Sequence, residues 1–164
     1  MQKLSWKEKY AGILVLFIGI IFLLMQVANY ASNTSHPYAI QNGSLTIDKN
    51  ELFTDIKTFL VIFMGIAAGF LLLKSKPVGW VLGLPVLMLF ATFILVTASQ
   101  SIISQKGKID QSLAIPGIAL LLLILAIIFL FTRSARQKYR ASKSIVLLTL
   151  LLFVAVTGLY YFLQ

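Results

Sequence analysis

The stretch that decides the fold is GIAAGFLLLKSKPVGWVLG, residues 65–83. A short basic turn, Lys74-Ser75-Lys76-Pro77, separates two apolar arms, and each arm carries two glycines four residues apart. Glycines at this spacing leave a flat strip on a helix, where a second helix backbone can approach closely. Because the turn is short, the arms must lie antiparallel, so the stretch predicts a tightly packed transmembrane hairpin. The glycines are Gly65 and Gly69 before the turn and Gly79 and Gly83 after it.

The spacing of these glycines also predicts where the two arms meet. Gly69 lies seven residues before Lys76, and Gly83 lies seven residues after it. Both glycines should therefore sit at a similar depth in the membrane. We expect the second and third spans to approach each other most closely there, within one chain.

Composition places the whole chain in a membrane. The 164 residues have a mean hydropathy of +0.93, with 59% apolar and 12% charged residues. A soluble domain carries about 25% charged residues, whereas crossing a hydrocarbon core of about 30 Å takes about 20 helical residues. Cysteine is absent, which excludes disulfides, thiol catalysis and cysteine-ligated metals.

Five apolar runs predict an all-α, polytopic integral membrane protein that forms a single membrane domain. A cleaved signal peptide is the alternative for the first run, but that run is long and lacks a clean A-x-A site, which favours a retained span. The predicted spans are residues 11–31, 53–73, 78–99, 113–132 and 145–162.

The first polar connection, residues 32–52, is predicted to be external and compact. An Asn42-Gly43 pair lies between β-compatible residues in 38–47, which is a β-hairpin signal. Asp48 precedes Glu51 by three residues, a variant of the capping box that predicts a helix start near Lys49.

Lysine and arginine fix the orientation. Ten of the fourteen basic residues fall in the N-terminal head, the turn at Lys74 and the loop 133–143, where Glu8 is the one acid. Basic residues in short loops stay on the cytoplasmic side, so the sequence predicts a cytoplasmic N-terminus and an external C-terminus. Because topology accounts for the whole net charge of +9, nucleic-acid binding is not expected.

The loop 133–143 is basic and contains no acid. Each basic residue near a bilayer surface is worth about 1 kcal/mol of attraction to anionic lipids. The loop is therefore a candidate contact for anionic lipid headgroups or for a partner's acidic face, although topological anchoring alone is favoured. The candidate residues are Arg133, Arg136, Lys138, Arg140 and Lys143.

Candidate chemistry elsewhere is sparse. The single histidine, His36, shares the external segment with Asp48 and Glu51, and Asp55 follows just beyond it. An outer metal site or general base is therefore conceivable, but a solvated histidine is favoured. No ionisable residue lies at the centre of a span, which disfavours proton or ion pathways. The polar residues within spans are predicted to make helix–helix contacts; they are Gln26, Asn29, Thr92, Thr97, Thr149 and Thr157.

These features predict a non-catalytic protein of the bacterial inner membrane, without cofactor or metal. The favoured function is an accessory or scaffolding subunit of a larger membrane complex, with other membrane proteins as partners. The alternative is an oligomeric transporter or channel lined by the threonines, Gln26 and Asn29. A membrane-surface enzyme acting through His36 and the outer carboxylates ranks third.

Overall fold

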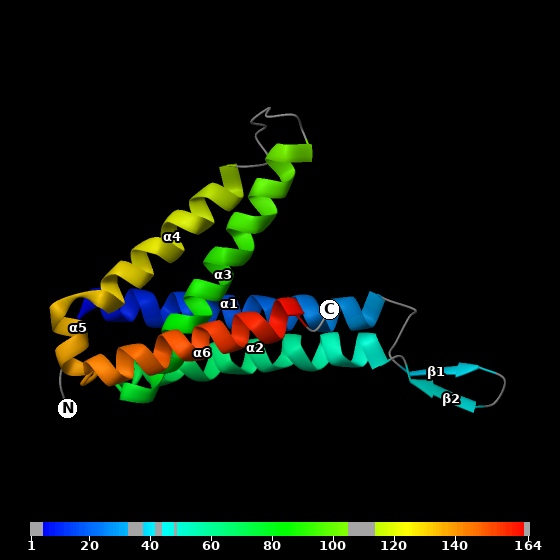
Figure 1. Cartoon of the computed structure of the whole chain (residues 1–164), viewed down its shortest axis with the longest axis horizontal. Helices are drawn as coiled ribbons and strands as arrows, with labels where there is room; N and C mark the ends of the chain where they lie inside the picture. The colour runs from blue at the N-terminus through cyan, green and yellow to red at the C-terminus, as the bar shows by residue number, and fades with distance from the viewer. Residues whose placement is uncertain (1–4, 33–37, 42–43, 48, 105–113, 163–164) are drawn as a thin grey trace.

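The computed structural model describes residues 5–32, 38–41, 44–47, 49–104 and 114–162, and this part of the chain is almost entirely helical (Figure 1). The helices and strands follow one another as α1 (Trp6–Ser32), β1 (Tyr38–Gln41), β2 (Ser44–Ile47), α2 (Lys49–Leu73), α3 (Pro77–Ser104), α4 (Ala114–Phe131), α5 (Arg133–Lys138) and α6 (Lys143–Phe162).

Within the described residues, four helices are long and apolar enough to cross a membrane. They are α1, residues 52–73 of α2, residues 77–100 of α3, and α4. The part of α6 whose side chains are described, Lys143–Gly158, is apolar but shorter. The protein is therefore helical with several apolar segments that suggest membrane insertion, as composition predicted.

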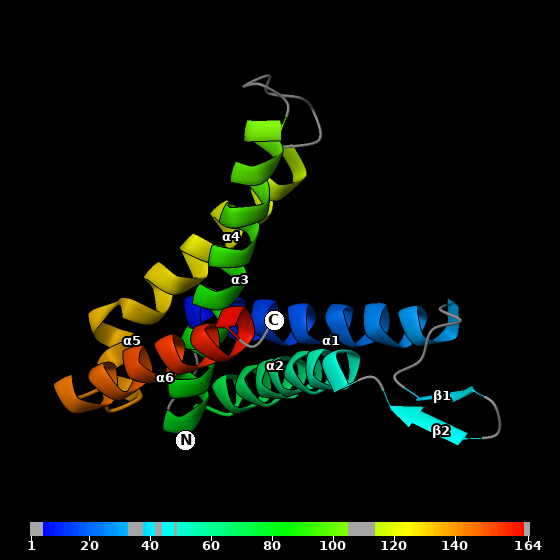
Figure 2. The same cartoon turned by 45° about the vertical axis from the view of Figure 1, so that its right-hand side comes forward.

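The helices form a V rather than a parallel bundle (Figures 1 and 2). Helices α1 and α2 run side by side, whereas the α3–α4 pair leaves them at an angle, so the far ends of the two pairs separate. Helix α3 is central because it packs on α2, α4 and α6. Its first half supplies much of the core, where Trp80, Leu84 and Leu87 are buried.

The turn between α2 and α3 has the geometry of a helix C-cap. The Ser75 N–H donates to the Leu72 carbonyl at 2.9 Å, and the Lys76 N–H donates to the Leu71 carbonyl at 2.9 Å. These are the two bonds of a Schellman motif, with Ser75 in the left-handed conformation at φ 55°. Pro77 then opens α3, where a missing N–H costs nothing. Helix α2 thus ends at the predicted residue, and α3 begins one residue before its predicted span.

The glycines before the turn lie against α1, and a Cβ built on Gly65 would also lie 3.7 Å from the Val86 Cγ1 of α3. A Cβ built on Gly69 would lie 2.6 Å from the backbone nitrogen of Leu16 in α1, and Gly65 lies against Gly19, also in α1. The expectation that Gly69 faces α3 was therefore wrong. Helix α1 carries a glycine of its own opposite Gly65, and a Cβ built on this residue, Gly19, would lie 3.0 Å from the Ile66 backbone nitrogen of α2.

The glycines after the turn do pack on α2. A Cβ on Gly79 would lie 2.4 Å from the Leu72 backbone nitrogen, and one on Gly83 would lie 2.8 Å from the Leu72 Cδ1. The contact at Gly79 is with backbone, whereas the contact at Gly83 is with the end of a side chain. The closest approach recorded between α2 and α3 at these glycines is thus next to the turn, at Gly79, and not at Gly83.

Two further segments differ from or extend the prediction. Residues 133–138 form the short helix α5 rather than a loop, and α3 continues to Ser104, beyond the predicted end of its span.

Strands β1 and β2 pair antiparallel with Tyr38 opposite Ile47. The predicted turn at Asn42-Gly43 and the predicted cap at Asp48 lie outside the described residues.

Candidate functional site

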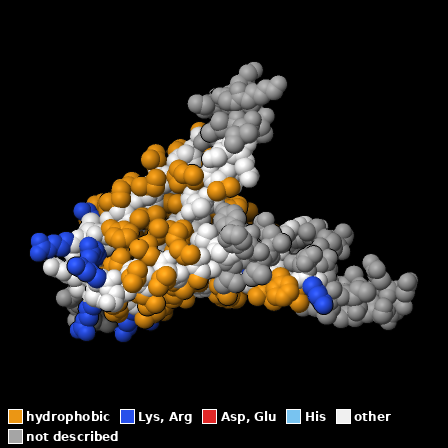
Figure 3. All heavy atoms as spheres, in the orientation of Figure 1, with side chains coloured by type: hydrophobic (Ala, Val, Ile, Leu, Met, Phe, Trp, Pro, Cys, Tyr) orange, Lys and Arg blue, Asp and Glu red, His pale blue; other side chains and the backbone are white. Residues whose placement is uncertain are grey.

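Three basic segments meet at the narrow end of the V. These segments, far apart in sequence, are the start of α1, the end of α2 with its turn, and α5 with the residue after it. Side-chain bonds join α5 to α1 and Tyr139, the residue after α5, to α2. Figure 3 shows lysine and arginine side chains gathered at this end, beside a largely apolar body. We call this end of the molecule the basic end.

A buried ion pair connects α1 to α5 at the basic end. The Lys138 Nζ lies 2.7 Å from the Glu8 Oε2, and the two side chains are 10% and 2% exposed. Glu8 also accepts a hydrogen bond from the Ser5 N–H at 2.9 Å, while the Glu8 N–H donates to the Ser5 Oγ at 3.4 Å. This is a capping box at the start of α1. Lys138 was one of the candidate contacts for lipid headgroups or a partner, with topological anchoring favoured; in the structure its ammonium pairs with Glu8.

Two buried aromatic side chains also connect helices near the basic end. The Tyr139 hydroxyl donates to the Leu72 carbonyl of α2 at 3.1 Å. The Trp80 Nε1 of α3 donates to the Leu130 carbonyl of α4 at 2.9 Å. The Leu72 carbonyl already accepts the Ser75 N–H of the turn, so Tyr139 adds a second bond to it. The Leu130 carbonyl lies in the last turn of α4, where carbonyls lack the usual helical partners. Each bond fixes a second element against the end of a helix.

The basic end also carries cations that face outward. Lys74, Lys76 and four basic side chains of the 133–143 segment are exposed, and Lys74 lies over the Phe70 ring at 4.2 Å from its centroid. Such a surface can attract anionic groups. The four exposed residues of the segment are Arg133, Arg136, Arg140 and Lys143.

The bond from Tyr139 gives a prediction in alkaline solution. Burial first, and the nearby Glu8 carboxylate second, raise the pKa of Tyr139 above its ordinary value of 10.0. The folded state therefore favours the neutral phenol, and its contribution to stability is complete below pH 10 and decreases as the pH rises above it. Between pH 9 and pH 11.5, the unfolding midpoint of the wild type in detergent should fall more steeply than that of Tyr139→Phe.

At neutral pH, the Tyr139→Phe variant measures the contribution of the hydrogen bond from Tyr139 to the Leu72 carbonyl. It loses the bond to Leu72, which should lower the free energy of unfolding by about 0.5–1.5 kcal/mol. Parallel pH profiles for the two proteins would contradict the assignment, since lysine deprotonation affects both alike.

A polar cluster joins α1 and α2 toward the open end of the V. Asp55 accepts a hydrogen bond from the Gln26 Nε2 at 3.1 Å through one oxygen and from the Tyr30 hydroxyl through the other. Tyr30 in turn stacks on Phe59, with ring centroids 6.2 Å apart. The sequence singled out Gln26 and Asp55 separately and missed Tyr30. A carboxylate three residues into an apolar segment was the signal that an interhelical partner was needed.

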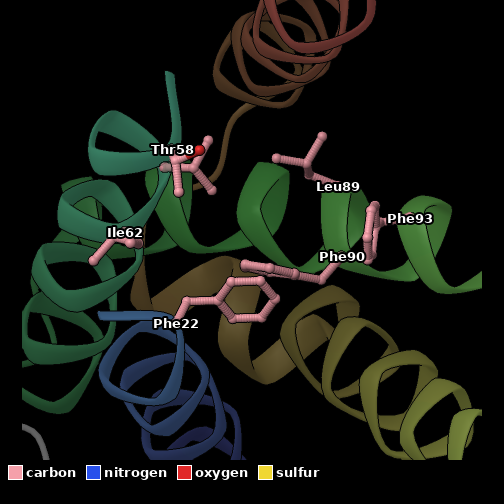
Figure 4. A pocket seen from close by; sticks show the side chains of 7 residues that line it. Phe22, Thr58, Ile62, Leu89, Phe90 and Phe93 are labelled. Atoms are coloured by element: carbon pink, nitrogen blue, oxygen red, sulfur yellow. The ribbon is translucent and has the colours of Figure 1, made fainter. Parts of the chain in front are cut away.

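An apolar groove lies beside this cluster, where α3 separates from α2 (Figure 4). Its cavity volume is about 40 Å³. The rings of Phe22 and Phe90, 4.7 Å apart, border it. Its one polar side chain, Thr58, donates to the Thr54 carbonyl of its own helix at 2.8 Å. The lining residues are Phe22, Thr58, Val61, Ile62, Leu89, Phe90 and Phe93.

The remaining polar candidates do not converge on a site. The hydroxyls of Thr92, Thr97 and Thr149 each donate to a carbonyl four residues earlier in the same helix. The Thr157 hydroxyl is buried and has no hydrogen-bond partner within the described part of the chain. His36 and Asp48 lie outside the described residues. Within the segments that the structure describes, no three His, Asp or Glu side chains come close enough to hold a metal ion.

The comparisons with known proteins add no relative from which a function could be transferred. No protein-family model, curated protein sequence or solved structure significantly matches this chain.

Proposed function

We propose that this protein is a small, non-catalytic integral membrane protein that serves as an accessory or scaffolding subunit of a larger membrane complex. The observation that carries the proposal is the V itself. Side-chain bonds hold the basic end together, whereas the α1–α2 and α3–α4 pairs diverge from it (Figure 1). Many large apolar side chains of the described helices are exposed, and Figure 3 shows apolar side chains over much of the described body. Faces of this kind are suited to other membrane helices.

Helix α4 presents the clearest such face. Its buried residues are Leu123, Ala126 and Leu130, whereas Ile118 and Leu121 are 61% and 64% exposed. Gly117 lies on the exposed side, and a Cβ built on it would meet nothing within 4 Å. A glycine on an open helix face allows a second helix backbone to approach closely. We assign the partner's contact to this side of α4.

The proposed topology has five spans. Helix α6 contains 20 residues, which at about 1.5 Å per residue reaches about 30 Å, the thickness of a hydrocarbon core. It starts at the basic end beside α5 and packs on α3. With the basic end cytoplasmic, as the positive-inside rule requires, the N-terminus lies in the cytoplasm, and the β1–β2 pair and the C-terminus lie outside the cell.

Co-purification tests the accessory role. The tagged protein, extracted from its native membranes in a mild detergent, should carry a different membrane protein in fixed stoichiometry, as measured by native mass spectrometry. Gly117→Leu should abolish the association. Gly158→Leu is the matched control, because Gly158 in α6 also has nothing within 4 Å of a built Cβ. A defined oligomer of this chain alone would favour the transporter or channel, and a lone monomer would contradict both.

Cysteine labelling tests the topology. The chain contains no cysteine, so single-cysteine variants carry no background. In intact cells, Ser44→Cys and Ser104→Cys should react with a membrane-impermeant maleimide, whereas Ser75→Cys and Ser134→Cys should react only after the membrane is opened. Labelling of Ser134→Cys in sealed cells would overturn the orientation.

A further inference from the structure

We propose that the groove between α2 and α3 holds the acyl chain of a bilayer aminophospholipid, and that the ammonium headgroup of this lipid donates a hydrogen bond to Asp55. The lipid site is separate from the face assigned to a protein partner, which lies on α4. It therefore does not depend on the accessory role.

The size and lining of the groove favour an acyl chain. Its walls are apolar, and Thr58, its one polar side chain, already donates its hydroxyl proton to Thr54. A helix with its side chains is about 10–12 Å across, so it cannot enter a cavity of about 40 Å³, whereas a short stretch of one acyl chain can lie in it. The lining residues lie inside the candidate spans of α1, α2 and α3, which places the opening among the lipid chains of the bilayer.

Asp55 lies where the headgroup of such a lipid would be. It precedes Thr58 by three residues on α2, and Gln26 follows Phe22 by four residues on α1. Residues at these spacings are neighbours on one helix surface, so the polar cluster sits one turn beyond the groove. That turn lies toward the end of α1 and the start of α2, the membrane surface opposite the basic end.

The chemistry of Asp55 selects the headgroup. Each carboxylate oxygen accepts one hydrogen bond from the protein, from Gln26 or from Tyr30, and each retains a further lone pair. An ionised carboxylate is acceptor-only, so it can add a donor but not an anion. A primary ammonium offers both the donors and the complementary charge, whereas a quaternary ammonium has no N–H and an anionic glycerol headgroup brings repulsion.

Native mass spectrometry of the full-length protein in detergent provides the test. The protein is titrated with phosphatidylethanolamine, phosphatidylcholine or phosphatidylglycerol of identical acyl chains. A charge-assisted hydrogen bond is worth about 1.5 kcal/mol or more, so phosphatidylethanolamine should bind about tenfold more tightly than the other two. In Asp55→Asn, the three lipids should bind within about twofold of one another.

A second pair of variants separates the groove from lipid bound elsewhere on the protein. Thr58→Phe places a ring in the groove and should reduce the retention of all three lipids by about tenfold. Leu148→Phe adds a ring at an exposed position of α6, outside both proposed sites, and should leave retention unchanged. If Thr58→Phe does not fold, Val61→Phe fills the same groove from the neighbouring turn.

Three outcomes would overturn the proposal. They are unchanged lipid retention in the folded groove variant, a phosphatidylethanolamine preference that persists in Asp55→Asn, and a protein helix crosslinked into the groove through a photoreactive residue at Phe93. The first would mean unspecific annular lipid only. The second would mean that Asp55 serves solely to join α1 to α2.

Discussion

Replacing Gly79 by alanine should destabilise the protein strongly, although the change adds a single methyl group. The added Cβ would lie 2.4 Å from the Leu72 nitrogen and 2.5 Å from the Leu71 carbonyl carbon. Both are backbone atoms of α2, so no side-chain rotation can relieve the clash, and the helices must separate. We expect a loss of about 1–3 kcal/mol or more in the free energy of unfolding, measured as a lower thermal midpoint in detergent.

The same substitution on an open face is the control. Gly117→Ala meets no atom within 4 Å, so it should be neutral or should stabilise α4 by up to about 1 kcal/mol through helix propensity. Gly83→Ala should fall between the two, because its nearest neighbour is the movable Leu72 Cδ1. Equal effects at Gly79 and Gly117 would contradict the packing described above.

Hydropathy and turn chemistry predicted much of this fold. The basic turn at Lys74–Pro77 stops α2 and opens α3, and each predicted apolar run lies in a helix, because length and apolarity are properties of a single segment. Which neighbouring helix each helix face contacts depends on more than one segment, so length and apolarity do not predict it. Gly69 could meet either neighbour of α2, and the sequence offered no means of knowing that Gly19 of α1 lies opposite Gly65.

The polar contacts between helices were predicted least well. Lys138 was assigned to the surface because it lies among exposed basic residues, but its partner is 130 positions away, in the first turn of α1. Tyr139 follows it directly and reaches α2 instead. Such pairs depend on how the helices are arranged in space, and no local spacing encodes them. The S-x-x-E pattern of Ser5 and Glu8 was visible, but it predicts a cap and not an interhelical ion pair.

Three side-chain bonds connect the helices to one another at the basic end. Tyr139 connects the segment after α5 to α2, Trp80 connects α3 to α4, and the Lys138–Glu8 pair connects α5 to α1. All three involve the first turns of α1 and α3 or the last turns of α2, α4 and α5, the end at which the helices converge (Figure 1). The opposite halves of the α1–α2 and α3–α4 pairs contribute none of these three bonds.

The largest effect is expected on removing one member of the buried ion pair. Glu8→Ala leaves the Lys138 ammonium, whose side chain is 10% exposed, without its carboxylate, and it also removes the acceptor for the Ser5 N–H. Breaking a buried pair by removing one partner costs about 3–5 kcal/mol, because the remaining charge stays desolvated. Thermal unfolding in detergent should show a large fall in midpoint, and protease digestion should cut near α5 earlier than in the wild type.

The double variant separates the cost of an unpaired charge from the value of the pair. Glu8→Leu combined with Lys138→Met replaces both charges with apolar groups of similar size, and such replacements are often neutral or stabilising. The double variant should therefore be more stable than either single variant, with a coupling energy of about 0.5–3 kcal/mol between the two sites. Strictly additive losses would mean that Glu8 and Lys138 act independently.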